Sequence, residues 1–263
     1  GDGGFPWFPG SRYADRFTTQ HIALGIAHLL HLGLKIDNDT LKLQRAAQDF
    51  CYREMIADYE RHINVYKRPK EDFFPSSIHL LFLYSESFHM LHPTLGGTAQ
   101  ARDEPLMDFF RAQAASRWIE SSLFTQALLA LVAHRKGMQP TAKDIVASLK
   151  ERAVKSDELG MYWSLACGHF FDQLPIETHA LLIEVFSEVA GDRDAVAELR
   201  LWLLKNKQTK NWKTTKGTAA AVYALLLGGE SWLDSTELVS VKVGGTAMPM
   251  VDAEPGTGYV KHR

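Results

Sequence analysis

The sequence is poor in cysteine, and the two cysteines that it has lie far apart. Cys51 and Cys167 are the only ones among 263 residues, and neither belongs to a paired-cysteine motif. This placement favours two buried free thiols over a metal or redox site, because cysteines of those sites usually come in closely spaced pairs. A single disulfide is compatible with the count, so the redox compartment stays open.

The sequence also lacks an excess of charge and a long hydrophobic run. Its 29 Lys and Arg nearly balance 31 Asp and Glu, for a net charge of -2. This balance provides no electrostatic attraction to nucleic acid or to an acidic membrane surface. No apolar run reaches the roughly 20 residues that span a bilayer, and no signal peptide is seen. We expect no nucleic-acid partner and no membrane-spanning segment. The chain begins inside a motif at Gly1, which predicts a piece of a longer protein.

Common catalytic and ligand-binding motifs are absent as well. There is no Gly-x-Ser-x-Gly, and Gly96-Gly97 is not followed by the Lys-Ser or Lys-Thr of a phosphate loop. Two groups of histidines have helical spacing: His21, His28 and His31 form one, and His89 with His92 the other. Neither group has the further ligands that a zinc site needs. We therefore expect no catalytic residue, no cofactor and no metal ion.

What recurs in the sequence is a tryptophan corner that leads into an apolar helix. It occurs as Gly-Gly-Phe-Pro-Trp-Phe-Pro-Gly at Gly3 to Gly10, Gly-Met-Tyr-Trp-Ser at Gly160 to Ser164, and Lys-Asn-Trp-Lys-Thr-Thr at Lys210 to Thr215. Trp163 and Trp212 lie about 49 residues apart, and Trp7 lies about three such intervals earlier. This period is typical of stacked helix pairs, which can close into a ring. We expect each tryptophan to be packed against the neighbouring pair.

Hydrophobic periodicity predicts helices along most of the chain. The expected ranges are 18–34, 41–61, 76–91, 106–117, 121–134, 141–154, 176–190, 194–205 and 217–227. The character changes after Trp232, where residues 238–243 alternate apolar and polar and Gly244-Gly245 predicts a turn. We expect a helical domain over residues 1–233 that is truncated at its N-terminus, and the start of a β-sandwich over residues 234–263.

Three stretches in matching order resemble the thioester-domain region of bacterial alpha-2-macroglobulin-like proteins. They are Asp2 to Leu29 with its Phe-Pro-Trp-Phe-Pro-Gly, Asn211 to Leu225, and the closing strand with Val-Gly-Gly and Gly-Thr-Gly-Tyr. The resemblance implies an α/α toroid, related in fold to terpenoid cyclases and prenyltransferase β-subunits. It also implies a non-enzymatic role in trapping proteases at the cell envelope or in the periplasm. The implied partners are proteases and the other domains of the same protein.

The residues that give this family its covalent chemistry are not in the chain. The family's thioester motif is Cys-x-Glu-Gln, whereas Cys51 is followed by Tyr-Arg-Glu and Cys167 by Gly-His-Phe. Neither cysteine can form the thioester. If the motif precedes this chain in the parent protein, trapping is covalent. If the parent protein lacks the motif, trapping is steric.

An alternative function is that of a toroid-shaped carbohydrate-active enzyme, a lyase or a glycosidase. Tyr162, Trp163, Glu177 and His179 lie near one corner and offer acid, base and aromatic groups. The competing interpretation is that Glu177 begins a helix, where a carboxylate is favoured by the helix dipole. Other toroid chemistries are disfavoured, because Asp37-Asn-Asp-Thr and Asp192-Arg-Asp-Ala both depart from the Asp-x-Asp-Asp of a terpene cyclase.

Overall fold

The computed structural model describes most of the chain as helices that fall within one compact unit. Described are residues 2–8, 10–95, 103–165, 174–210, 212, 214–228, 241–243 and 246–248. Residues 1–227 form one compact unit and residues 228–263 a second.

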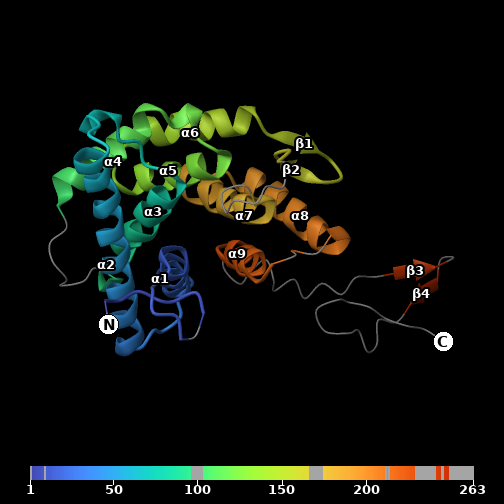
Figure 1. Cartoon of the computed structure of the whole chain (residues 1–263). Helices are drawn as coiled ribbons and strands as arrows, with labels where there is room; N and C mark the ends of the chain where they lie inside the picture. Colours follow the sequence, from blue (N-terminus) through green and yellow to red (C-terminus); the bar gives the residue numbers. More distant parts are fainter. Residues whose placement is uncertain are drawn as a thin grey trace. The chain divides into compact units, whose positions relative to one another are not determined.

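The first unit contains the expected helices, within a few residues of their predicted bounds (Figure 1). They are α1 (Arg16–His31), α2 (Asn38–Glu60), α3 (Ser77–Leu91), α4 (Glu104–Ser116), α5 (Leu123–Arg135), α6 (Gln139–Glu151), α7 (Pro175–Val185), α8 (Arg193–Lys210) and α9 (Thr215–Leu226). Two π-helical turns, Arg61–Val65 and Phe186–Ala190, extend α2 and α7, and short 3-10 turns lie at Lys70–Asp72, Pro93–Leu95 and Trp118–Glu120. The protein is therefore mainly helical.

Local chemistry explains where several helices begin. The side chains of Asp15, Asp37 and Ser122 each accept a hydrogen bond from a backbone N–H in the first turn of the helix that follows. Thr214 does the same for α9. Such caps satisfy N–H groups that have no partner inside the helix, and each contributes about 1 kcal/mol.

Odd- and even-numbered helices have different environments. α5 is buried along almost its whole length, from Phe124 to Ala133 and again at Arg135. In α6, by contrast, burial is limited to Ala142, Ile145 and Leu149, which lie on one side of the helix. In Figure 1, α2, α6 and α8 lie toward the outside of the helical unit. The odd-numbered helices thus supply most of the core.

The odd-numbered helices pack on one another in chain order. α1 packs on α3, α3 on α5, α5 on α7, and α7 on α9, while α2, α6 and α8 each pack on the odd-numbered helix that precedes them. The last odd-numbered helix also contacts the first. His28 of α1 stacks on Tyr223 of α9 with ring centroids 3.7 Å apart, and Lys216 lies over the ring of Phe17. The series of contacts therefore returns from α9 to α1.

A β-hairpin that was not predicted follows α6. The expected helix to Val154 ends at Glu151, and β1 (Val154–Ser156) pairs antiparallel with β2 (Gly160–Tyr162). β2 packs on α8 through Gly160, which has a positive φ of 75°. A Cβ at this position would overlap the carbonyl oxygen of Glu198, so only glycine fits. Three-residue strands carry too little periodicity to be recognised in a sequence.

Gly3 in the first corner is docked in the same way. Its φ is 91°, and a Cβ there would overlap the carbonyl oxygen of Ala46 in α2. Gly3 and Gly160 therefore each place a corner against the backbone of the even-numbered helix that follows. The repeated motif has a structural basis in these two close backbone approaches.

The second unit contains a short hairpin in its described part. β3 (Val241–Val243) pairs antiparallel with β4 (Thr246–Met248), with Val241 opposite Met248. The strand expected at residues 238–243 is present in its last three residues. Gly244-Gly245, the expected turn, lies outside the described residues, as does most of the expected β-sandwich segment.

Candidate functional site

The tryptophan corners differ in burial. Trp163 and Trp212 are buried, with 6% and 7% of their surface exposed. Each indole N–H donates a hydrogen bond of 3.1 Å to a carbonyl oxygen of the preceding even-numbered helix, Leu149 in α6 and Leu203 in α8. These two residues pack as expected.

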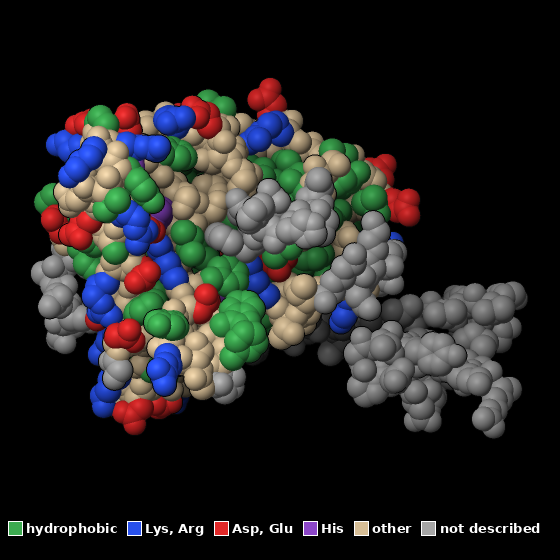
Figure 2. Space-filling view, in the orientation of Figure 1, with side chains coloured by type: hydrophobic (Ala, Val, Ile, Leu, Met, Phe, Trp, Pro, Cys, Tyr) green, Lys and Arg blue, Asp and Glu red, His purple; other side chains and the backbone are tan. Residues whose placement is uncertain are grey.

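The packing predicted for Trp7 is wrong. Its side chain is 59% exposed, and its neighbours Phe8 and Tyr13 are exposed too. Figure 2 shows hydrophobic side chains at the surface in this part of the molecule. The corner is held instead at Phe5, whose N–H donates to Thr19 Oγ1 at 2.8 Å. In the described part of the chain, no helix lies before this corner in the way that α6 and α8 lie before the other two.

His179 forms the second corner together with Trp163. The backbone N–H of Trp163 donates to His179 Nε2 at 3.1 Å, so Nδ1 carries the ring proton and donates it to the carbonyl oxygen of Pro175 at 2.6 Å. The ring stacks on Trp202 with centroids 3.6 Å apart. Burial lowers the pKa of His179 to about 4. His179 is therefore a neutral packing residue with both ring nitrogens engaged.

The side chains of the other residues in the enzyme hypothesis are also engaged in contacts within the protein. Tyr162 also stacks on Trp202, with ring centroids 6.4 Å apart. Glu177 is buried near the start of α7, and the hydroxyl of Thr214 lies 3.5 Å from its Oε1. The structure thus brings Tyr162, Trp163 and His179 together around Trp202, but His179 has no ring nitrogen left for proton transfer to a substrate.

The histidines that share one side of α1 each have a different hydrogen-bond partner. His21 bonds the carbonyl oxygen of Phe17, His28 bonds Tyr84, and His31 bonds His92 through Nδ1 and Nε2, 2.9 Å apart. The remaining candidate, His89, pairs with Glu86. Among the described residues, no three His, Cys, Asp or Glu side chains are arranged as metal ligands.

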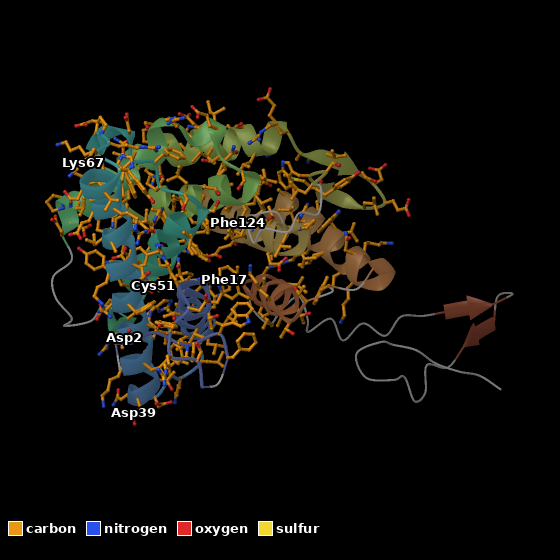
Figure 3. The ribbon with its side chains drawn as sticks, in the orientation of Figure 1. Asp2, Phe17, Asp39, Cys51, Lys67 and Phe124 are labelled. Atoms are coloured by element: carbon orange, nitrogen blue, oxygen red, sulfur yellow. The ribbon has the colours of Figure 1, made fainter. Side chains whose placement is uncertain are left out.

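Cys51 lies buried on α2 (Figure 3), and burial raises the pKa of its thiol to about 12. A thiol in this state is a poor nucleophile, as expected for a packing residue. Cys167 and Gly96-Gly97 lie outside the described residues.

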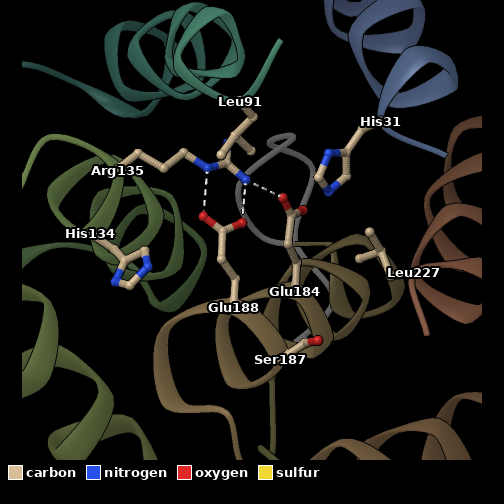
Figure 4. A pocket seen from close by; sticks show the side chains of 8 residues that line it. All are labelled: His31, Leu91, His134, Arg135, Glu184, Ser187, Glu188 and Leu227. Carbon is tan, nitrogen blue, oxygen red and sulfur yellow. Dashed lines mark hydrogen bonds and ion pairs between the residues drawn. The ribbon is translucent and has the colours of Figure 1, made fainter. Parts of the chain in front are cut away.

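An ion-pair network at the centre of the helical unit was not predicted from the sequence. Arg135, at the end of α5, donates from Nε and NH2 to the two oxygens of Glu188 at 2.8 and 2.6 Å, and from NH2 to Glu184 at 2.6 Å (Figure 4). Its NH1 donates to Ser87 of α3 at 3.0 Å. The guanidinium also lies 4.2 Å from the centroid of the Phe88 ring. One buried cation therefore joins α3, α5 and the end of α7.

The network continues from Glu184 to α1 through two further side chains. Tyr84 donates its hydroxyl proton to Glu184 Oε2 at 2.5 Å. Because that proton is used, His28 Nε2, 3.1 Å away, must be the donor to the Tyr84 oxygen. His28 in turn stacks on Tyr223. Side chains from all five odd-numbered helices thus meet in one polar cluster.

The charges of this cluster are fixed by its surroundings. Burial alone would lower the pKa of Arg135, but the bonds to Glu188 and the charge of Glu184 raise it overall. Burial raises the pKa of Glu184 and of Tyr84, and burial lowers that of His28 well below its usual value. Arg135 is therefore a permanent cation, with Tyr84 and His28 neutral beside it. A buried ion pair in this state is costly to break, because the partner would be left charged without compensation.

A pocket of about 410 Å³ opens beside the network. Its lining residues are His31, Leu91, His134, Arg135, Glu184, Ser187, Glu188 and Leu227 (Figure 4). They belong to the last turns of α1, α3 and α5, to the end of α7 with its π-helical turn, and to the residue that follows α9. The pocket therefore lies where the C-terminal ends of the odd-numbered helices meet.

Comparison with known proteins adds no identification. A scan against models of protein families finds no match, and a search of the curated proteins finds no similar protein. Within the described residues, no helix combines the length and the apolar character needed to cross a membrane. The resemblance to alpha-2-macroglobulin-like proteins therefore stays a prediction from the sequence.

Proposed function

We propose that the helical unit is an α/α toroid and that it serves as a non-enzymatic domain of an alpha-2-macroglobulin-like protein that traps proteases. The observation that supports a toroid best is the sequence in which the odd-numbered helices contact one another. It runs from α1 to α9 and returns to α1 through His28 and Tyr223. The even-numbered helices that pack on them would form the outer layer. Stacked helix pairs of this kind bury a continuous core when they close into a ring.

The repeated corners support the family assignment. Two of the stretches that carry the resemblance join successive helix pairs. Trp212 bonds α8, which precedes its corner, and Gly3 approaches the backbone of α2 at Ala46. The resemblance adds the biological role, which is the trapping of proteases at the bacterial envelope.

A mechanical role fits the state of the polar side chains. The candidate acid and base residues are engaged in packing, with His179 between Trp163 and Pro175 and Glu177 beside Thr214. Arg135 is saturated by carboxylates and Ser87. In this proposal the domain keeps its shape while another part of the protein is cut. Trapping is covalent if the parent protein has a Cys-x-Glu-Gln motif and steric if it lacks one.

Protease retention tests the proposal directly. The protein in its full natural length is incubated with active trypsin and, as a control, with trypsin whose active site is blocked. The products are separated by size-exclusion chromatography. We expect active trypsin to elute with the large protein and to cleave a small chromogenic peptide better than casein. Blocked trypsin should elute free, because it cannot make the cut that starts trapping. Free elution of active trypsin would refute the proposed function.

A further inference from the structure

The pocket at the C-terminal ends of the odd-numbered helices has no part in the proposed function. Its wall carries two carboxylates, Glu184 and Glu188, and one guanidinium, that of Arg135. Both oxygens of Glu184 are engaged, by Arg135 and by Tyr84. Glu188 is the more accessible carboxylate, with 21% of its side chain exposed, and carboxylate oxygens accept more than the one bond that each receives here. The unused acceptor capacity of Glu188 therefore faces the pocket.

The helix ends around the pocket contribute negative potential. His31 and Leu91 are the last residues of α1 and α3, Arg135 is the last residue of α5, and Leu227 caps α9. The carbonyl groups of a final helical turn carry partial negative charge, which favours a cation. Arg135 offsets this potential in part, but its guanidinium is already shared between the two carboxylates.

Hydrogen-bond acceptors complete the site. Nδ1 of His134 is buried and makes no hydrogen bond to any part of the chain that the structure describes. The hydroxyl of Ser187 and the ring of His31 lie in the same wall, and the side chains of Leu91 and Leu227 supply an apolar surface. A buried nitrogen without a partner, in the same pocket wall as the carboxylate of Glu188, points to a ligand with hydrogen-bonding groups.

We propose that this pocket binds a small organic cation, a primary alkylammonium whose N–H groups bond Glu188 and whose alkyl part lies against Leu91 and Leu227. A volume of about 410 Å³ suits a molecule of this size. An ammonium group presents three donors at one point, which fits convergent acceptors. An inorganic divalent ion fits less well, because no three ligating side chains are arranged for it among the described residues. This site does not depend on the proposed function.

Calorimetric titration of the 263-residue chain at low salt and pH 7.5 tests the site. The probe is 1,5-diaminopentane; pentane-1,5-diol has the same chain length without charge, and glutarate has the opposite charge. We expect the diamine to bind once per chain and the other two not to bind. Absence of saturable diamine binding, equal binding of the diol, or tighter binding of glutarate would each overturn the proposal.

Variants locate the binding. Glu188→Gln should lower the affinity for the diamine at least tenfold, whereas Glu120→Gln, which changes an exposed carboxylate paired with Arg117, should leave it unchanged. Because Glu188→Gln also weakens the ion pair with Arg135, a second variant uses the exposed Ser187. Ser187→Lys places a tethered ammonium at the pocket, so it should block the diamine while the circular-dichroism spectrum stays that of the wild type. Diamine binding that is unaltered in both site variants would refute the assignment.

Discussion

Acid should destabilise this protein through His179, which is buried without charge between Trp163 and Trp202. Both ring nitrogens are engaged, and burial lowers the pKa of the folded state to about 4, against 6.5 for an exposed histidine. The unfolded chain therefore binds a proton at a higher pH than the folded chain does. The stability that this histidine contributes is complete above about pH 6.5 and is lost as the pH falls from there toward 4.

The size of the effect follows from the two pKa values. At pH 5 the unfolded imidazole is almost fully protonated, while the folded one is mostly neutral. The linkage relation then gives a loss of about 2 kcal/mol at pH 5 relative to pH 7.5. His179→Gln removes the titration and keeps an amide oxygen that can accept the N–H of Trp163. The free energy of unfolding should therefore fall by about 2 kcal/mol less in this variant than in the wild type.

Urea unfolding at pH 7.5 and pH 5, followed by circular dichroism, measures this difference. His89→Gln is a control of opposite sign, because the hydrogen bond to Glu86 raises the pKa of His89. That histidine stabilises the folded state below about pH 6.5, and its contribution is lost as the pH rises through the folded pKa. Its removal should make the loss of unfolding free energy on acidification larger. If His179→Gln and the wild type show the same pH dependence, the assignment of a buried neutral His179 is wrong.

Two further substitution pairs test the corners, each by the midpoint of urea unfolding. Gly160→Ala should lower the free energy of unfolding by roughly 3 kcal/mol, because the added Cβ meets the Glu198 carbonyl. Gly137 has a φ of 77° and nothing near the position of a Cβ, so Gly137→Ala should lower it by only about 1 kcal/mol. Equal losses of stability in the two variants would contradict the close approach. Trp163→Phe should cost about 1 to 3 kcal/mol through the lost bond to the buried Leu149 carbonyl, and Trp7→Phe should change stability by less than about 0.5 kcal/mol. A loss at Trp7 as large as that at Trp163 would show that its side chain is packed.

The helices could be predicted because their hydrophobic patterns are strong. Apolar runs such as that of α5 and one-sided patterns such as that of α6 each specify a helix, and capping residues mark several of the starts. The hairpin of β1 and β2 could not be predicted, because three-residue strands give no usable pattern. Gly160 was noticed as part of a corner, but its contact with α8 depends on the tertiary structure.

The central network was visible in the sequence only in part. Glu184 lies inside the apolar run of α7, and Arg135 is the last residue of the apolar run of α5. A charged side chain within an apolar run implies a buried partner of opposite charge. The sequence does not say which partner, because the two residues are separated by 49 positions. Trp7 illustrates the same limit. Its motif resembles those of the buried tryptophans, but burial depends on whether a helix lies beside it.

The stack of His28 on Tyr223 has a consequence for how the protein folds. It joins the first helix of the unit to the last, so the contact cannot form until nearly the whole unit has been synthesised. Contacts between neighbouring helices are local and form early, whereas closing a loop of this length is entropically costly and slow. During synthesis His28 therefore stays without Tyr223 as its partner until α9 has been made. The order of folding is set by the same contact that completes the core.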